Sequence, residues 1–140
     1  VSATDFDPYG DGTENPGQAP LAIDGDTSTA WHTTLYKKPI GESQAGVGLI
    51  VDLGKSMSVS SVKVFFEAAG AAFSVYVTDD AAPRLRQTQL LGKVRIAGKS
   101  ERVAADKPLK GRYIVVWLTD LPRGNKGYQA GITQVTVPVR

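Results

Sequence analysis

The sequence predicts an all-β domain built as a sandwich or barrel of short strands. Apolar and polar residues alternate over several short runs, turn-forming residues separate these runs, and no helix-length segment keeps a period of 3.6 residues. Many short strands without a long helix are typical of sandwiches and barrels. The strand runs lie at residues 49–53, 62–66, 73–77, 94–96, 113–118 and 135–139.

Two of these runs indicate their place in the sheet. Residues 113–118 are apolar on both faces, which predicts a central strand covered on both sides. Pro138 in the last run cannot donate a ladder hydrogen bond, so we expect that strand at an edge. Turn residues predict chain reversals at 54–56, 69–70, 79–80, 98–100, 107–108 and 122–125.

The first 46 residues differ from the rest because glycine and proline are frequent in them. This composition predicts turns and ordered loops rather than long elements. Short helical turns are expected at 20–23, where Pro20 suits a helix start, and near 29–31. Apolar and aromatic side chains recur through the segment, so it should pack against the sheet. Trp31 here, and Trp117 in a strand run, are expected in the core.

Length and composition agree with one globular domain over residues 1–140. A chain of this size can bury its own core, and 41% hydrophobic with 21% charged residues is ordinary. The net charge of +2 lacks the basic excess of nucleic-acid-binding proteins. No apolar run approaches the length that spans a membrane. The chain begins at Val1 without a methionine or a signal peptide, which suggests part of a larger protein.

Catalytic patterns are weak. The absence of cysteine excludes disulfides and thiolate sites, and His32 is the only histidine. Neither a Gly-x-Ser-x-Gly motif nor a phosphate-binding loop is present. Carboxylates are paired at Asp5/Asp7, Asp11/Glu14, Asp24/Asp26 and Asp79/Asp80. All four pairs lie in predicted turns, which favours caps or calcium ligands over acid–base chemistry. The sequence therefore predicts a domain that is not an enzyme.

The segment 21–33 carries the most informative chemistry. Asp24 and Asp26 flank Gly25, which permits a tight bend that turns both carboxylates toward a common centre, and Thr29 follows. Hard oxygen ligands of this kind suit Ca²⁺. An Asx turn that caps a short helix explains the same residues equally well. From the spacing alone, both interpretations stay open.

Several segments together resemble the discoidin-like family. Ala-Ile-Asp-Gly-Asp at 22–26, followed by Thr-Ala-Trp-His at 29–32, resembles its A-(I/V)-D-G-(N/D)-x-x-T-x-W stretch. The segments 48–54, 59–64, 112–116 and 131–135 resemble its core strands in the same order. The family includes coagulation factor 5/8 type C domains and family 32 carbohydrate-binding modules. The resemblance implies a jelly-roll β-sandwich, galactose-binding-domain-like, over nearly the whole chain, with a binding role.

Three further segments, 5–12, 14–15 and 116–122, resemble a narrower group. This group consists of the extracytoplasmic C-terminal domains of actinobacterial membrane proteins. In the MviN-type proteins, related to lipid II flippases, such a domain follows a transmembrane part and an intracellular pseudokinase. The resemblance implies an extracytoplasmic domain tethered to a membrane-spanning parent of peptidoglycan biosynthesis.

The family resemblance also implies a structural calcium site. The implied ligands are Leu21, Asp24, Asp26, Thr29, Thr133 and Gln134. Leu21 and Thr133 would contribute backbone carbonyls. Gln134 stands where the family commonly has glutamate, so the site loses one negative charge and calcium affinity should fall.

Ligand recognition in this family lies on loops at one end of the sandwich. The loop candidates here are Tyr9, His32, Tyr36, Arg123, Asn125 and Tyr128. The preferred hypothesis is a module that binds a cell-wall saccharide or a lipid-linked precursor. The family's usual sugar contacts match poorly, which favours an alternative, a module that docks a protein of the cell envelope. A third hypothesis, a hydrolase of cell-wall glycans, requires a carboxylate pair in a groove.

Overall fold

The computed structural model describes residues 1–138, except for the side chain of Ser43. Within this range most of the chain is extended, and the helices are short. The elements in chain order are β1 Ser2–Phe6, η1 Pro16–Ala22, β2 Trp31–His32, α1 Ile40–Ser43, β3 Val47–Phe66, β4 Ala72–Thr78, η2 Leu85–Gln87, β5 Gln89–Val94, β6 Ser100–Asp120 and β7 Gly131–Thr136.

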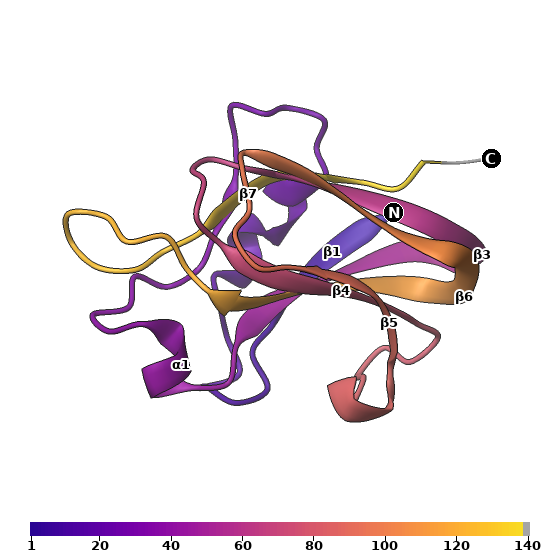
Figure 1. Cartoon of the computed structure of the whole chain (residues 1–140), viewed down its shortest axis with the longest axis horizontal. Helices are drawn as coiled ribbons and strands as arrows, with labels where there is room; N and C mark the ends of the chain where they lie inside the picture. Colours follow the sequence, from indigo (N-terminus) through magenta and orange to yellow (C-terminus); the bar gives the residue numbers. More distant parts are fainter. Residues whose placement is uncertain (139–140) are drawn as a thin grey trace.

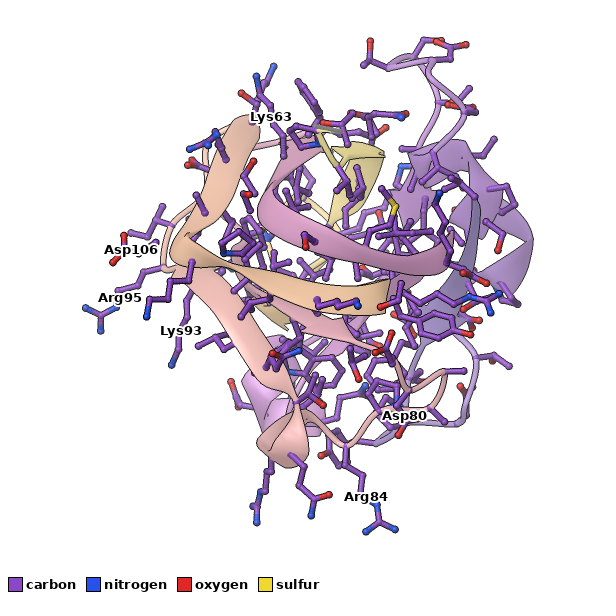
Figure 2. The ribbon with its side chains drawn as sticks, turned by 90° about the vertical axis from the view of Figure 1, so that its right-hand side faces the viewer. Lys63, Asp80, Arg84, Lys93, Arg95 and Asp106 are labelled. Carbon is purple, nitrogen blue, oxygen red and sulfur yellow. The ribbon has the colours of Figure 1, made fainter. Side chains whose placement is uncertain are left out.

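Strands β3 and β6 form the framework of the molecule. They pair antiparallel along their lengths, from Val47 opposite Leu118 to Phe65 opposite Ser100. Register shifts along this ladder mark the places where the strands bend. Figure 2 shows such a bend in β6 near Asp106. Because they bend, both strands pass from one layer of the sandwich to the other.

The two layers follow from the pairing of the strand halves. In the first layer, β1 pairs with residues 48–52 of β3, while β4 joins residues 113–120 of β6 to β5. In the second layer, β7 pairs with residues 63–66 of β3 and carries the short β2. All of these pairs are antiparallel, so the predicted all-β sandwich is confirmed.

Apolar side chains between the layers form the main core. Leu49 of β3 and Val116 of β6 are fully buried there. Phe66 and Phe73 meet edge to face, with ring centroids 5.2 Å apart. Trp31 is also fully buried, which confirms its predicted core position.

A second, smaller apolar cluster covers the outer face of the first layer. Ile50, Val115 and Trp117 are buried in it, and Phe6 and Leu85 pack against them. This cluster explains why β6 is apolar on both faces. The prediction of a covered central strand is therefore confirmed, as is the core position of Trp117.

Two predicted chain reversals are wrong because their turn residues lie inside long strands. Residues 54–56 lie in β3, where Gly54 has a φ of +88° beside a register shift. Residues 107–108 lie in β6, where residues 105–108 bulge between paired positions. Glycine and proline mark irregularities here because the strands change direction without leaving the sheet.

The predicted strand at 94–96 has the wrong bounds. β5 begins at Gln89 and ends at Val94, and Ile96 is 81% exposed. Beyond Val94, which pairs with Phe73, the next contact between the two segments is the N–H of Ala97 with the carbonyl of Ala71, so residues 95–96 lie unpaired between them. Pattern reasoning also misses β1, whose residues are mostly polar.

Strand β7 ends at Thr136, earlier than the predicted run 135–139, whose last residue Val139 lies outside the described residues. Among the residues that are described, β2 covers only 131–132 of its outer side. The rest of β7 is an edge, as Pro138 predicts.

The N-terminal loops contain the helical turns. The turn predicted at 20–23 belongs to the longer η1, and a plain turn at 27–28 replaces the one expected near 29–31. Figure 1 shows α1 and the yellow loop after β6 at one end of the molecule, with the bends of β3 and β6 at the other. None of the helices in the described part of the chain is long and apolar enough to cross a membrane.

Candidate functional site

Two adjoining hollows lie where the segments 32–36 and 122–129 meet, and we call them together the loop-end site. Both are lined by Leu35 and Gln129. The first, of about 360 Å³, is also lined by Ala68, Pro122, Arg123, Gly124, Asn125, Lys126 and Gly127. The second, of about 510 Å³, is also lined by Asn15, Gln18, His32, Thr33 and Thr34.

His32 is fixed at the centre of the polar hollow. Its Nε2 lies 2.6 Å from Oε1 of Glu67, and its backbone N–H donates to Oε1 of Gln18 at 3.0 Å. The side-chain amide of Asn15 donates to the carbonyl of His32 at 2.7 Å. About one third of the His32 side chain remains exposed, at 33%. The imidazole is therefore oriented by neighbours and still accessible to a ligand.

The segment 122–129 folds back on itself and on the segment 32–36. Tyr36 and Tyr128 exchange two backbone hydrogen bonds, of 2.8 and 2.7 Å. Gly127 has a φ of +148°, and a Cβ at this position would lie 2.4 Å from the carbonyl oxygen of Tyr36. Only glycine permits this approach. The guanidinium of Arg123 stacks over the ring of Tyr128 at 6.0 Å, which orders one wall of the first hollow.

Glu14 is the buried residue that holds this end of the molecule together. Its carboxylate accepts hydrogen bonds from the N–H of Thr34 at 2.7 Å and from the hydroxyl of Tyr36 at 2.9 Å. Its carbonyl accepts the indole N–H of Trp31 at 2.7 Å. Burial raises the pKa of Glu14, although these hydrogen bonds to the carboxylate oppose the shift. Burial and the neighbouring Glu14 carboxylate likewise raise the pKa of Tyr36.

The structure places the six candidate ligand residues in three roles. His32, Arg123 and Asn125 line the loop-end site. Tyr36 and Tyr128 lie behind its walls and support them. Tyr9 lines a different hollow.

Sequence reasoning missed several polar residues of the site. Asn15, Gln18 and Gln129 line it, Glu67 orients His32, and Glu14 supports the walls. Amides have no pattern that separates a site from a solvated loop. The position of Glu14, two residues before Pro16, favours a cap instead. No carboxylate lines either hollow within the described residues, so the site lacks the pair that glycoside hydrolysis requires.

The Asp24–Thr29 loop forms Asx-type turns. Oδ1 of Asp24 accepts the N–H of Asp26 at 2.9 Å, and its Oδ2 accepts the hydroxyl of Thr29. Gly25 has a φ of +78°, and its N–H donates to Oε1 of Gln134 at 3.0 Å. The loop is thus tied to β7 through Gln134.

The remaining implied metal ligands lie close to this loop in the fold. Leu21 is in η1, and Thr133 is in β7, where its hydroxyl donates to the carbonyl of Phe65. The side-chain oxygens of Asp24, Asp26, Thr29 and Gln134 are of the type that Ca²⁺ prefers. In the described part of the chain, no group of three or more acidic or histidine side chains could hold a metal ion. A calcium ion at this loop would therefore have only two carboxylate ligands, those of Asp24 and Asp26.

Solved structures with the same fold include carbohydrate-binding modules at low sequence identity. Chitosan-binding module 1 of a chitosanase/glucanase from Paenibacillus sp. IK-5 is similar with a TM-score of 0.71 and 23% identity, over 99% of this chain and 94% of that one. The CBM32 of AlyQ, in complex with 4,5-unsaturated mannuronic acid, has a TM-score of 0.69 and 20% identity, over 100% and 95%. The family 32 module of C. perfringens NanJ, in complex with galactose, has a TM-score of 0.66 and 22% identity, over 97% and 91%. These likenesses show the shared fold.

A family match covers most of the chain. Residues 2–134 match the F5/8 type C domain, the family that the Asp24–Trp31 stretch and the core strands resemble. This membership agrees with the prediction of a non-catalytic binding domain. The chain therefore belongs to the F5/8 type C domain family.

Proposed function

We propose that this domain is a carbohydrate-binding module that holds a saccharide at the loop-end site. The observation that carries the proposal is a pre-organised polar hollow, in which His32 is oriented by Glu67 and Gln18 and remains exposed. A site that is ordered before binding loses little conformational entropy when the ligand arrives.

The lining suits the hydroxyl groups of a sugar. Asn125 offers donors and an acceptor, Gln129 offers its amide oxygen because its Nε2 already donates to the carbonyl of Thr33, and Arg123 offers donors only. Both ring nitrogens of His32 lie within hydrogen-bond distance of Glu67 and Gln18, so its imidazole offers an ordered ring surface. Leu35 provides apolar surface for the C–H groups of a sugar ring. With few aromatic contacts, we expect weak binding that depends on hydrogen bonds.

The similar modules support this class of ligand. Two of these modules are in complex with galactose and with 4,5-unsaturated mannuronic acid, and the third is a chitosan-binding module. We carry only the class, a saccharide, over to this chain, because the lining residues must decide which sugar fits.

The finer proposal rests on the sequence resemblance. In it, the ligand is a cell-wall saccharide or lipid-linked precursor, the parent is an MviN-type membrane protein, and the domain lies outside the cytoplasm. A domain at the cell surface would meet such ligands directly.

We also propose a structural calcium site in the Asp24–Thr29 loop. Asp24, Asp26 and Thr29 would hold the ion with the carbonyls of Leu21 and Thr133 and the side chain of Gln134. Bound calcium would cross-link the loop to β7 electrostatically. The hydrogen bond from Gly25 to Gln134 already makes part of that link.

Isothermal titration calorimetry with galactose, chitotriose and soluble peptidoglycan fragments tests the main proposal. We expect at least one ligand to bind. Asn125→Ala should weaken that binding by about tenfold, since it removes a hydrogen-bonding side chain from the site. His32→Ala should weaken it as well, since it removes the ring that Glu67 and Gln18 hold in place. Arg95→Ala, an exposed position outside both hollows, is the control and should bind as the wild type does. No heat with any saccharide would contradict the proposal and favour the alternative, a protein partner in the cell envelope.

A further inference from the structure

A separate hollow, of about 350 Å³, lies between the end of β1 with the residues that follow it and the loop that leads into β5. Phe6, Tyr9 and Leu85 line it together with two prolines, and Arg84 and Arg86 complete the lining with Gln87. None of these residues lines the loop-end site. This Tyr9 hollow combines aromatic surface with positive charge, which the loop-end site does not.

Tyr9 presents an aromatic ring that is held in place. Its side chain is among the exposed large ones, at 60%, yet its ring packs edge-on against Trp117 with centroids 5.9 Å apart. Trp117 is buried and also contacts Phe6, at 5.6 Å. A ring fixed in this way offers a large contact area at low entropic cost.

Arg84 and Arg86 bring two cations without partners to the same hollow. In the part of the chain that the structure describes, neither guanidinium takes part in an ion pair or stacks on an aromatic ring. Their backbone is nevertheless ordered, because the carbonyl of Arg84 accepts the N–H of Gln87 and the hydroxyl of Thr88, at 2.9 and 2.7 Å. Figure 2 shows the side chain of Arg84 extending outward from this end of the molecule.

Neighbouring carboxylates are engaged elsewhere. Asp7, between Phe6 and Pro8, is buried and accepts the side-chain amide of Gln44 at 2.6 Å. Asp80, in the loop before Arg84, accepts the N–H of Ala82 at 2.9 Å. Among the described residues, neither carboxylate lines the hollow or forms an ion pair with Arg84 or Arg86, so the two arginines are available to a ligand.

We propose that the Tyr9 hollow is a second binding site, specific for an acidic saccharide such as a uronic acid unit. The sugar ring stacks on Tyr9, and the carboxylate accepts hydrogen bonds from Arg84 and Arg86. Arginine suits this role because its planar fork of donors matches the two oxygens of a carboxylate. A neutral sugar would leave the arginines unused, and a simple anion would leave the aromatic surface unused. This site goes beyond the proposed function, which concerns the loop-end site alone.

NMR titration of the ¹⁵N-labelled domain with a galacturonate disaccharide, a neutral galactose disaccharide and acetate tests this site. We expect amide shifts at 6–9 and 83–87 with the galacturonate only. Arg84→Ala should weaken this binding by about tenfold or more, because a charge-assisted hydrogen bond is lost. Tyr9→Ala should weaken it as well. Arg95→Ala removes the same charge from an exposed position outside the hollow and should leave the affinity unchanged.

Three outcomes would overturn the second site. These are no shifts at 6–9 and 83–87, equal shifts with the neutral disaccharide or acetate, or equal affinities of the Arg84→Ala and Arg95→Ala variants. Shifts at 32–36 and 123–129 report on the loop-end site separately, so failure of either proposal is distinguishable from failure of the other.

Discussion

The strands from β3 to β7 and the loops that precede them are held in different ways. Apolar side chains between two layers hold the strands, and Phe73 with its edge-to-face neighbour Phe66 is representative. Hydrogen bonds to a few buried polar groups hold the loops, with Glu14 at their centre. The sheet therefore supplies the scaffold, whereas long-range polar contacts set the geometry of the loop-end site.

The largest expected effect on stability comes from disrupting the apolar core between the two layers of the sheet. Phe73→Ala removes a fully buried aromatic side chain and should lower the free energy of unfolding by about 3–5 kcal/mol. Chemical denaturation monitored by tryptophan fluorescence measures this. A loss below about 1 kcal/mol would show that the main core does not depend on the contact between the layers.

Disrupting the hydrogen bonds around Glu14 should lower the free energy of unfolding somewhat less. Glu14→Ala leaves the N–H of Thr34 and the hydroxyl of Tyr36 without their acceptor, and should lower the free energy of unfolding by about 3 kcal/mol. Tyr36→Phe removes a single donor from the same network and should cost about 1 kcal/mol. If both variants lost the same amount, the carboxylate would not be the centre of the network.

The pH dependence of stability should distinguish the ionisable carboxylate of Glu14 from an uncharged side chain of the same shape, as in Glu14→Gln. The pKa of Glu14 is raised in the folded state. Its carboxylate therefore takes up a proton in the folded protein at a pH where Glu14 of the unfolded chain is still ionised. Its contribution is fully present below the unfolded pKa and is lost as pH rises through the folded pKa. The stability of the wild type relative to Glu14→Gln should therefore increase as the pH falls from neutral toward 4.5, the ordinary pKa of a glutamate. A constant difference over that range would contradict the raised pKa.

The smallest expected effect concerns the tie between the Asp24–Thr29 loop and β7. Gln134→Glu restores a carboxylate among the implied calcium ligands, so millimolar CaCl₂ should raise its melting temperature more than that of the wild type. MgCl₂ is the control salt, because Mg²⁺ fits a flexible oxygen site poorly. An equal response of both proteins to CaCl₂, or no response, would contradict the calcium proposal.

The difference between apolar strands and loops held by polar contacts also explains how much of the fold the sequence predicts. Alternating apolar residues place the centres of β3, β4 and β6, and two-sided apolarity identifies β6 as central. Bends in β3 and β6 are not predicted, because glycine and proline give the same local sequence signal in a chain reversal and in a bulge within a strand. Ile96 continues an alternating run but leaves the sheet, because the pairing with the β4 segment skips from Val94 to Ala97. Only the three-dimensional structure reveals such a contact.

Within the loop-end site, the sequence identifies the side chains with distinctive chemistry. His32, Arg123 and Asn125 line the hollows, and the motif that begins at Asp24 identifies the family. The role of Glu14 depends on contacts with residues about twenty positions away, and no local pattern encodes them. Tyr9 illustrates the same limit, because its pairing with Arg84 and Arg86 follows from the fold alone.

The most direct test of the central claim is an NMR titration of the ¹⁵N-labelled domain with neutral sugars and cell-wall fragments. We expect that amide shifts cluster at 32–36 and 123–129, and that Glu14→Gln weakens the response without unfolding the sheet. Shifts confined to other surfaces, or no shifts at millimolar ligand, would contradict saccharide binding at the loop-end site.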